Sequence, residues 1–533
     1  MIQALAPAFD NSYARELPGC YVAWPPAPVR EPRLLFLNEA LAEELRLPLE
    51  PLRGEAGARW FAGCELPPGA EPIAQAYAGH QFGGFSPQLG DGRALLMGEL
   101  LDRQGRRRDL AFKGSGRTPF SRGGDGKAAI GPMLREVLMG EAMHALGIPT
   151  TRALAVAATG EVVLRETRLP GAVLTRVAAS HLRVGTFQYF AARGETERVR
   201  QLADYAIARH DPSLAGEPDR FHAFLASVAR RQAALVASWM RVGFIHGVMN
   251  TDNMTISGET IDYGPCAFLE ACDPQAVFSS IDHHGRYAFG NQPTIARWNL
   301  ARLAEALLPL FHEEAEQAVA RAMEVIEAFP GWFAQALLAG HRRKLGLRAR
   351  PAGQVGAAGP SGDAPEAARD EADAALADDW LGLMQAHRVD FTLGWRRLAE
   401  VAQGLEGMPQ ARAPLEGLFP EAAMPACRAW LEHWQARLAQ DGRDGWDHGE
   451  ARAGEGDGPG TAAAMRRASP WIIPRNHRVE EALLAATAEG DLRPFESLLE
   501  ALRHPFEEDP ARARYAEPAP PEVTACYRTF CGT

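Results

Sequence analysis

His246-Gly247-Val248-Met249-Asn250-Thr251-Asp252-Asn253, followed after eight residues by Asp262-Tyr263-Gly264, is the part of the sequence that decides the fold prediction. We expect short strands at 254–256 and 260–261, so that Asn253 and Asp262 flank a tight hairpin. Two hard oxygen ligands in this arrangement suit an octahedral Mg²⁺ that also binds phosphate oxygens. Asp252 is placed to accept a proton from a hydroxyl group. By itself, the Asp252-Asn253 pair is also typical of an Asx turn.

A glycine-dense loop lies upstream, over residues 79–93, and includes Gly90-Asp91-Gly92-Arg93. Glycine lets backbone N–H groups approach a phosphate closely, although such a loop is equally typical of a hairpin turn. The loop is not part of a Walker A motif. The only Gly-Lys pair, Gly126-Lys127, is followed by Ala128, and Ser121 stands where the motif requires its first glycine. The sequence therefore argues against a P-loop NTPase.

Lysine is rare, because only Lys113, Lys127 and Lys344 occur among the 56 basic residues. Such a bias favours lysine at sites that need a compact ammonium group on a flexible stem. Lys113 ends an expected strand at 109–113, where the alternative is an edge residue that keeps the sheet soluble. The helix expected over 127–147 carries Glu136 and Glu141. Either carboxylate could hold the Lys113 ammonium for the phosphates of a nucleotide, and the sequence leaves the choice open.

The order of elements predicts an α+β fold, with a small antiparallel sheet and one long helix followed by a helical part. We divide the chain into an N-terminal extension (1–75), the sheet part (76–180), the helical part (181–350) and a helical C-terminal extension (351–533). Two stretches of the last unit, 351–374 and 440–468, are rich in Gly, Ala and charged residues, and we expect flexible insertions there.

The formal net charge of −11 argues against partners such as nucleic acid and anionic membranes. No stretch approaches the roughly 20 apolar residues of a membrane span. The seven cysteines are scattered without a C-x-x-C pair, which argues against a disulfide scaffold or a structural zinc site. We expect a cytoplasmic protein that is a monomer.

The glycine loop, strand lysine, helix glutamate, His246, Asn253 and Asp262-Tyr263-Gly264 together resemble the protein-kinase fold, with tyrosine in place of the phenylalanine of Asp-Phe-Gly. This resemblance implies a bilobal arrangement of a sheet lobe and a helical lobe. One departure is large, because Val248 stands where kinases have the catalytic aspartate. The departure argues against ordinary phosphoryl transfer to a hydroxyl group.

More specifically, residues 76–99, 113–151, 243–264 and 285–293 resemble the selenoprotein O (SelO/YdiU) family of pseudokinases. The resemblance implies a protein adenylyltransferase, a nucleotidyltransferase that binds ATP in an orientation inverted relative to kinases. AMP would then pass to Ser, Thr or Tyr hydroxyls of protein substrates, with release of pyrophosphate. For bacterial members the resemblance also implies UMP transfer with Mn²⁺.

The resemblance also implies roles for individual residues. Asp252 would be the catalytic base, Glu136 would pair with Lys113, and Asn253 and Asp262 would bind Mg²⁺ or Mn²⁺. The ATP-binding residues would be Gly90, Gly92, Arg93, Lys113, Asp125, Gly126, Arg176 and Arg183. Taken alone, Arg176 and Arg183 are typical of an exposed surface, and Asp125-Gly126 of a helix N-cap and turn. Cys531, near the C-terminus, could form a disulfide with Cys272.

Two other functions are compatible with the sequence. The missing aspartate at position 248 suggests a catalytically silent scaffold that binds nucleotides. A small-molecule kinase would share the fold and would release ADP rather than pyrophosphate.

Overall fold

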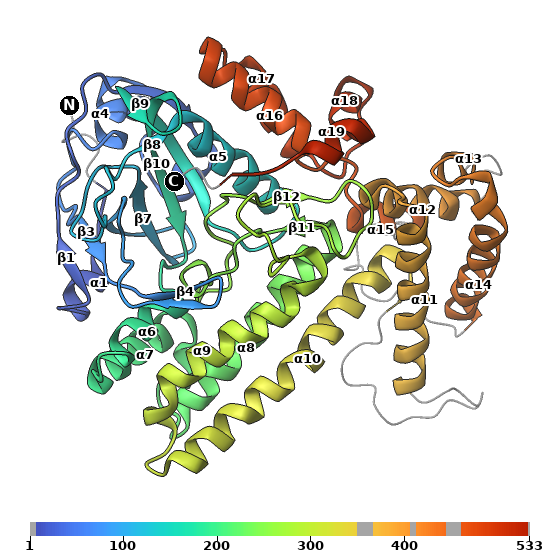
Figure 1. Ribbon diagram of the computed structural model, residues 1–533, viewed down its shortest axis with the longest axis horizontal. Helices are drawn as coiled ribbons and strands as arrows, with labels where there is room; N and C mark the ends of the chain where they lie inside the picture. Colours follow the sequence, from blue (N-terminus) through green and yellow to red (C-terminus); the bar gives the residue numbers. More distant parts are fainter. Residues whose placement is uncertain (1–6, 349–365, 406–411, 444–459, 531–533) are drawn as a thin grey trace.

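The computed structural model describes residues 7–348, 366–405, 412–443 and 460–530 (Figure 1). It is a mixed α and β structure in which one antiparallel sheet is followed by many helices. Strand order across the sheet is β1 (Tyr21–Ala23), β3 (Ile73–Gln75), β6 (Ala94–Leu101), β7 (Arg107–Lys113), β10 (Arg168–Ala178), β9 (Arg152–Leu164) and β2 (Arg33–Leu37), with β8 (Ala128–Ala129) paired to β10.

The sheet is larger than the sequence predicts, because three of its strands come from residues 1–75. β1 pairs with β3, and β2 pairs with β9 at the opposite edge. These strands are only three to five residues long and lie in Pro-rich sequence, so periodicity does not reveal them. The helices of this region are α1 (Ser12–Glu16), α2 (Glu39–Glu44), α3 (Leu49–Arg53) and α4 (Glu55–Phe61).

Helix α5 (Ile130–Ala145) is the expected long helix of the sheet part, and it is buried on nearly every side. One face contacts β9 and β10, while α16 (Asn476–Leu484) and α17 (Arg493–Leu502) cover another (Figure 1). A helix enclosed in this way is apolar around most of its circumference. It ends at Gly147, whose φ of +74° is the left-handed conformation that glycine adopts readily.

The helical part follows in the green and yellow section of Figure 1. Its helices are α6 (Val184–Ala191), α7 (Thr196–His210), α8 (Arg220–Val242), α9 (Gln292–Phe311) and α10 (Ala315–Leu345). The loop between α8 and α9 holds a two-stranded sheet of β11 (Phe244–Ile245) and β12 (Ala267–Phe268). The strands expected at 254–256 and 260–261 do not form a hairpin. Instead, Thr255 forms an isolated bridge with Arg183, and Thr260 with Thr150.

A second apolar core lies among α11 (Glu366–Ala386), α12 (Phe391–Leu405), α13 (Ala413–Glu416), α14 (Met424–Arg443) and α15 (Thr461–Ala468), around four buried tryptophans. Residues 366–374 and 461–468 are therefore helical, although we expected flexible insertions there. The rest of those segments, apart from 440–443 in α14 and Gly460, lies outside the described residues. The chain ends with α16, α17, α18 (Ala513–Ala516) and α19 (Pro521–Cys526). In the part of the chain that the structure describes, no helix is both long and apolar enough to cross a membrane.

Candidate active site

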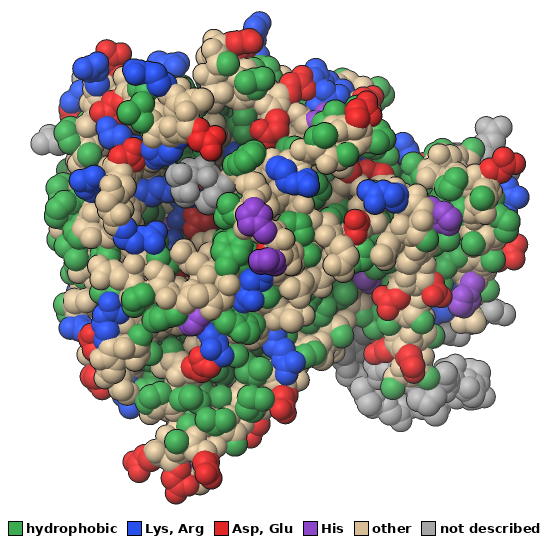
Figure 2. All heavy atoms as spheres, in the orientation of Figure 1, with side chains coloured by type: hydrophobic (Ala, Val, Ile, Leu, Met, Phe, Trp, Pro, Cys, Tyr) green, Lys and Arg blue, Asp and Glu red, His purple; other side chains and the backbone are tan. Residues whose placement is uncertain are grey.

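A cavity of about 500 Å³ opens between the sheet and the loop that precedes α9. Figure 2 shows a hollow beside the sheet, with Lys and Arg side chains gathered around it. Apart from the two cysteines, every site residue expected from the sequence lines this cavity: Gly90, Gly92, Arg93, Lys113, Asp125, Gly126, Glu136, Arg176, Arg183, Asp252, Asn253 and Asp262. Segments up to about 170 positions apart in the chain thus meet at one place.

Lys113 lies at the end of β7, which is a central strand between β6 and β10, so the edge-residue alternative is wrong. Its Nζ donates to Glu136 Oε2 and to Asp262 Oδ1, at 2.6 Å each. The structure also decides between the two helix carboxylates. Glu141 accepts two hydrogen bonds from Arg152, from Nε at 2.5 Å and from Nη2 at 2.8 Å. Glu136 is therefore the partner of Lys113.

Arg176 and Arg183 are both only 2% exposed, contrary to the surface position that is typical of arginine. Arg176 Nη1 donates to Asp262 Oδ1 at 2.7 Å and to Glu136 Oε1 at 3.1 Å. Arg183 lies over the ring of Tyr77, and its Nη2 is 3.9 Å from Asp262 Oδ2. Buried cations and carboxylates therefore alternate along this wall of the cavity.

Asp262 is the centre of this charge cluster. Burial alone would raise the pKa of its carboxyl group, but Lys113, Arg176 and Arg183 hold that pKa well below its usual range. The residue has a φ of +62°, a left-handed conformation that is uncommon outside glycine and is concentrated at functional sites. The carboxylate is thus ionised, and the backbone is constrained where it enters the cavity.

Asp252 lies in a single helical turn, residues 251–253, that contacts α6 and lines the cavity. Its Oδ2 accepts from Gln81 Nε2 at 3.2 Å, whereas Oδ1 is buried and has no partner among the described residues. Burial raises the pKa of this carboxyl group to about 6. A carboxylate with a raised pKa is a stronger base, as proton abstraction from a hydroxyl requires.

His246 supports this loop from behind. Its Nε2 donates to the backbone oxygen of Ile261 at 2.9 Å, because a carbonyl oxygen can only accept. Its Nδ1 accepts from Val248 N at 3.4 Å, and burial lowers the pKa of the imidazole. The neutral imidazole therefore links the segment that begins at His246 to Ile261, the residue before Asp262.

Oxygen donors that suit a divalent metal ion lie around the same cavity. Asn253 Nδ2 donates to Val248 O at 3.1 Å, which leaves its Oδ1 available. With the ionised Asp262 and the unpartnered Asp252 Oδ1, the donor set is of the kind Mg²⁺ prefers, and Mg²⁺ usually takes only one or two carboxylates plus phosphates and water. No group of three or more His, Cys, Asp or Glu side chains that could hold a metal is found within the described ranges.

Close packing requires glycine at positions 90 and 126. Gly90 has a φ of +66°, and a Cβ there would lie 2.3 Å from the Phe120 ring. Gly126 has a φ of +69°, and a Cβ would lie 2.1 Å from Gly116 O. Asp125 lines the cavity, but its carboxylate accepts from Arg165 at 2.9 and 3.1 Å. This ion pair orders the loop, and the expected contact of Asp125 with ATP stays a prediction.

Sequence reasoning missed several residues that line or brace the cavity. Gln81 contacts Asp252, and Tyr77 lies under Arg183. Asn250 Oδ1 accepts from Tyr287 OH at 2.6 Å and from Phe82 N at 3.1 Å. The available signal was the glycine-dense segment 79–93, which contains β4 (Gly79–Gln81) and β5 (Gly84–Ser86). Strand β4 contacts the helical turn at residues 251–253.

Cys272 is a buried free thiol whose Sγ contacts Leu381 O at 3.7 Å. Burial raises the pKa of this thiol to about 12. Cys531 lies outside the described residues, so the expected Cys272–Cys531 pair stays a prediction.

Comparisons with known proteins agree with the resemblance seen in the sequence. The family model described as "Protein adenylyltransferase SelO" matches residues 4–503. A protein nucleotidyltransferase YdiU of Cereibacter sphaeroides (strain KD131 / KCTC 12085) is 59% identical over 98% of this chain and 99% of its own length. Proteins of the same name from Chromobacterium violaceum and Mycobacterium sp. (strain KMS) are 58% and 53% identical, over 96% and 99% of this chain and 99% of their own lengths. The chain therefore belongs to the SelO family of nucleotidyltransferase enzymes.

Proposed function

We propose that this protein transfers AMP from ATP to Ser, Thr or Tyr hydroxyl groups of other proteins and releases pyrophosphate. The observation that carries the proposal is a cluster of three buried cations in the cavity that Asp252 also lines: Lys113 and Arg176 on strands of the sheet, and Arg183 at the start of α6. Fixed cations in a water-poor site stabilise a departing diphosphate without reorganisation. The proposed orientation of ATP is therefore inverted relative to a kinase, with the β- and γ-phosphates toward the sheet.

Each step of the proposed transfer can be assigned to residues of the cavity. Asp252 accepts the proton of the acceptor hydroxyl, whose oxygen attacks the α-phosphorus. The bond from that phosphorus to the bridging oxygen of the β-phosphate breaks, and pyrophosphate leaves toward Lys113, Arg176 and Arg183. Asn253 and Asp262 would hold Mg²⁺ or Mn²⁺, which neutralises charge on the phosphate oxygens when bound. Gly90, Gly92 and Arg93 would contact the nucleotide from the glycine loop.

The proposal includes a bilobal, protein-kinase-like arrangement. The sheet and α5 would form one lobe over residues 76–180, joined by strands from residues 1–75. Helices α6–α10 would form the other lobe over residues 181–350. The ion pair between Lys113 and Glu136 supports this, because kinases pair the corresponding strand lysine and helix glutamate, and Asp262 lies beside the pair. The monomeric state and cytoplasmic location stay predictions.

The test incubates the purified protein with lysate proteins, ATP and either Mg²⁺ or Mn²⁺, and measures intact and peptide masses. We expect AMP adducts on hydroxyl side chains, and their loss in Asp262→Ala. A matched control is Asp204→Ala, which removes an aspartate that pairs with Arg220 away from the cavity. Phosphate adducts with ADP release would indicate a kinase instead. In a parallel incubation with UTP in place of ATP, UMP adducts that form only with Mn²⁺, without AMP adducts from ATP, would assign the uridylyl alternative. The absence of any adduct would favour a silent scaffold.

A further inference from the structure

A second layer of buried polar groups lies behind Arg176, on the side away from the cavity. Arg176 Nε donates to His181 Nε2 at 3.3 Å. Because an arginine Nε can only donate, this imidazole nitrogen must be the acceptor. The proton of the neutral ring is then on Nδ1, which donates to Asp109 Oδ2 at 2.9 Å. The partners thus fix both the tautomer and the orientation of His181.

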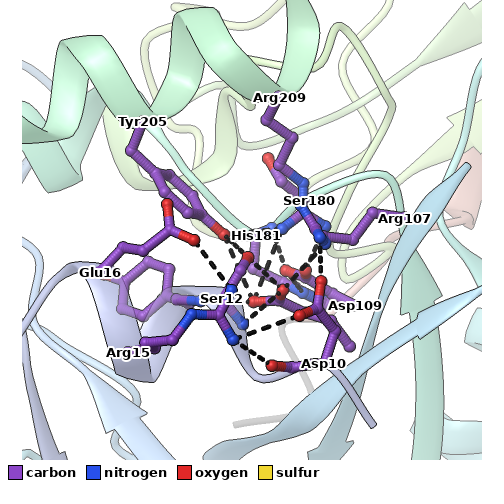
Figure 3. Close-up of polar contacts among 12 residues, drawn as sticks. Asp10, Ser12, Arg15, Glu16, Arg107, Asp109, Ser180, His181, Tyr205 and Arg209 are labelled. Atoms are coloured by element: carbon purple, nitrogen blue, oxygen red, sulfur yellow. Dashed lines mark hydrogen bonds and ion pairs between the residues drawn. The ribbon is translucent and has the colours of Figure 1, made fainter. Parts of the chain in front are cut away.

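Asp109 is itself held in place, as Figure 3 shows. Its Oδ2 also accepts from the backbone N of His181 at 2.7 Å, and its Oδ1 accepts from Arg209 Nη2 at 2.5 Å. Arg209 in turn donates to Tyr205 OH and to Ala179 O, at 2.9 and 2.8 Å. Burial would raise the pKa of Asp109, but Arg209 and His181 lower it to about 2. Burial lowers the pKa of His181, in agreement with a neutral ring.

The N-terminal segment closes this cluster from outside. Glu99 accepts from the backbone N of Ser12 at 2.9 Å and of Tyr13 at 2.8 Å. Ser12 Oγ lies 2.8 Å from Tyr205 OH, and Figure 3 shows these two side chains. All of these side chains are buried. The cluster is therefore dry, and its hydrogen bonds keep their directions better than exposed ones would.

The two contacts of Arg176 leave one part of its guanidinium group unused. Nε bonds to His181, and Nη1 bonds to Glu136 and Asp262. Within the described ranges Nη2 has no hydrogen-bond partner, and Arg176 lines the cavity. A guanidinium group is planar and rigid, so fixing Nε and Nη1 also fixes where Nη2 points.

We propose that His181, held by Asp109, is a positioning residue that aims Arg176 Nη2 at the departing diphosphate of ATP. This inference rests on the proposed function, because it assigns the β- and γ-phosphates to the sheet side of the cavity. His181 acts through Arg176 and touches neither the nucleotide nor the acceptor.

Two substitutions separate this role from a structural one. His181→Gln extends an amide oxygen to about the position of Nε2, and so keeps an acceptor for Arg176. His181→Asn keeps a donor near the position of Nδ1 for Asp109 but has no acceptor for Arg176. We expect His181→Asn to weaken ATP binding, and to raise KM for ATP, by roughly tenfold, the effect of one charge-assisted hydrogen bond. His181→Gln should stay within about twofold of the wild type.

A double-mutant cycle with Arg176→Lys gives the second readout. Lysine has no Nε, so His181→Asn should have no further effect on the dissociation constant of ATP in that background. The control for loss of a buried imidazole is His341→Asn, since His341 is buried against Trp395 in the C-terminal helical core. This control should lower the melting temperature without changing ATP binding.

Calorimetric titration with ATP and transfer assays on the same samples keep the two proposals distinct. Equal losses of ATP affinity in His181→Asn and His181→Gln would overturn the positioning role, as would an undiminished effect of His181→Asn in the Arg176→Lys background. If the wild type binds ATP without transferring AMP, the proposed function is wrong, and the ratio of dissociation constants still decides the role of His181. A wild type that does not bind ATP would overturn both.

Discussion

Glu136 and Glu141 offer a matched pair of perturbations on one helix. Both carboxylates are buried in α5, at 4% and 3% exposed, and both are paired with basic side chains. Glu136 accepts from Lys113 and Arg176 at the cavity, whereas Glu141 accepts from Arg152 outside it. Substitution by glutamine keeps the size of the side chain and removes one charge. Glu136→Gln and Glu141→Gln should therefore cost similar stability and very different activity.

The expected stability losses follow from the ion pairs. Removing one partner of a buried pair costs about 3–5 kcal/mol when the other charge is left uncompensated. In Glu136→Gln, Asp262 still faces both cations, and in Glu141→Gln, Arg152 is 13% exposed and gains some hydration. We therefore expect the low end for both, about 3 kcal/mol, or on the order of 3 °C in melting temperature for a chain of this length.

The expected effects on catalysis differ. Without Glu136, the Lys113 ammonium is held by Asp262 alone and moves from its position for the phosphates. Loss of one preorganised electrostatic contact should lower kcat/KM for AMP transfer by about 100-fold. Glu141→Gln should stay within about twofold of the wild type.

The assay combines scanning calorimetry with transfer of AMP from labelled ATP, measured well below both melting temperatures. Equal catalytic losses in the two variants would show that Glu136 acts only through the stability of α5. Full activity of Glu136→Gln would refute the assignment of Lys113 to the phosphates.

Three further outcomes are expected. Gly90→Ala places a methyl group 2.3 Å from the ring of Phe120, and calorimetry should show ATP binding weakened at least tenfold. The control is Gly123→Ala, where φ is +88° and no atom lies within 4 Å. This variant should lose only about 1 kcal/mol of stability, the cost of a side chain in the left-handed conformation. Wild-type binding by Gly90→Ala would argue against the loop as a nucleotide site. Burial raises the pKa of Glu259 to about 7, so the folded state keeps a proton that the unfolded state has lost, and stability falls as pH rises from about 4.5 through 7 by up to about 3 kcal/mol. Thermal unfolding should show that the stability of Glu259→Gln does not fall over this pH range and exceeds that of the wild type above pH 8. Parallel stability profiles of the two proteins would contradict the prediction. Peptide mapping after oxidation should find the Cys272–Cys531 link, and a free Cys531 would end that hypothesis.

The sequence by itself determined the local features of the site. A glycine-dense loop, a lysine at a strand end and an Asp-x-Gly segment can each be recognised from a few neighbouring residues. All three line one cavity in the structure. The α+β class and the end of α5 at Gly147 follow from equally local signals. The resemblance to the SelO family, which the comparisons confirm, rests on the same short segments.

Only the tertiary structure decided which groups meet. The choice of Glu136 over Glu141 depends on where Lys113 and Arg152 lie relative to a helix that is buried on most sides. The sequence predicts surface positions for Arg176 and Arg183, because arginine is usually exposed. Contacts with residues distant in sequence offset the cost of burying their charges. His181 carried no sequence signal at all, because its role lies in two hydrogen bonds whose partners come from β7 and β10. A buried charge is favourable only beside its partner, and such partners are set by contacts between distant segments rather than by neighbouring sequence.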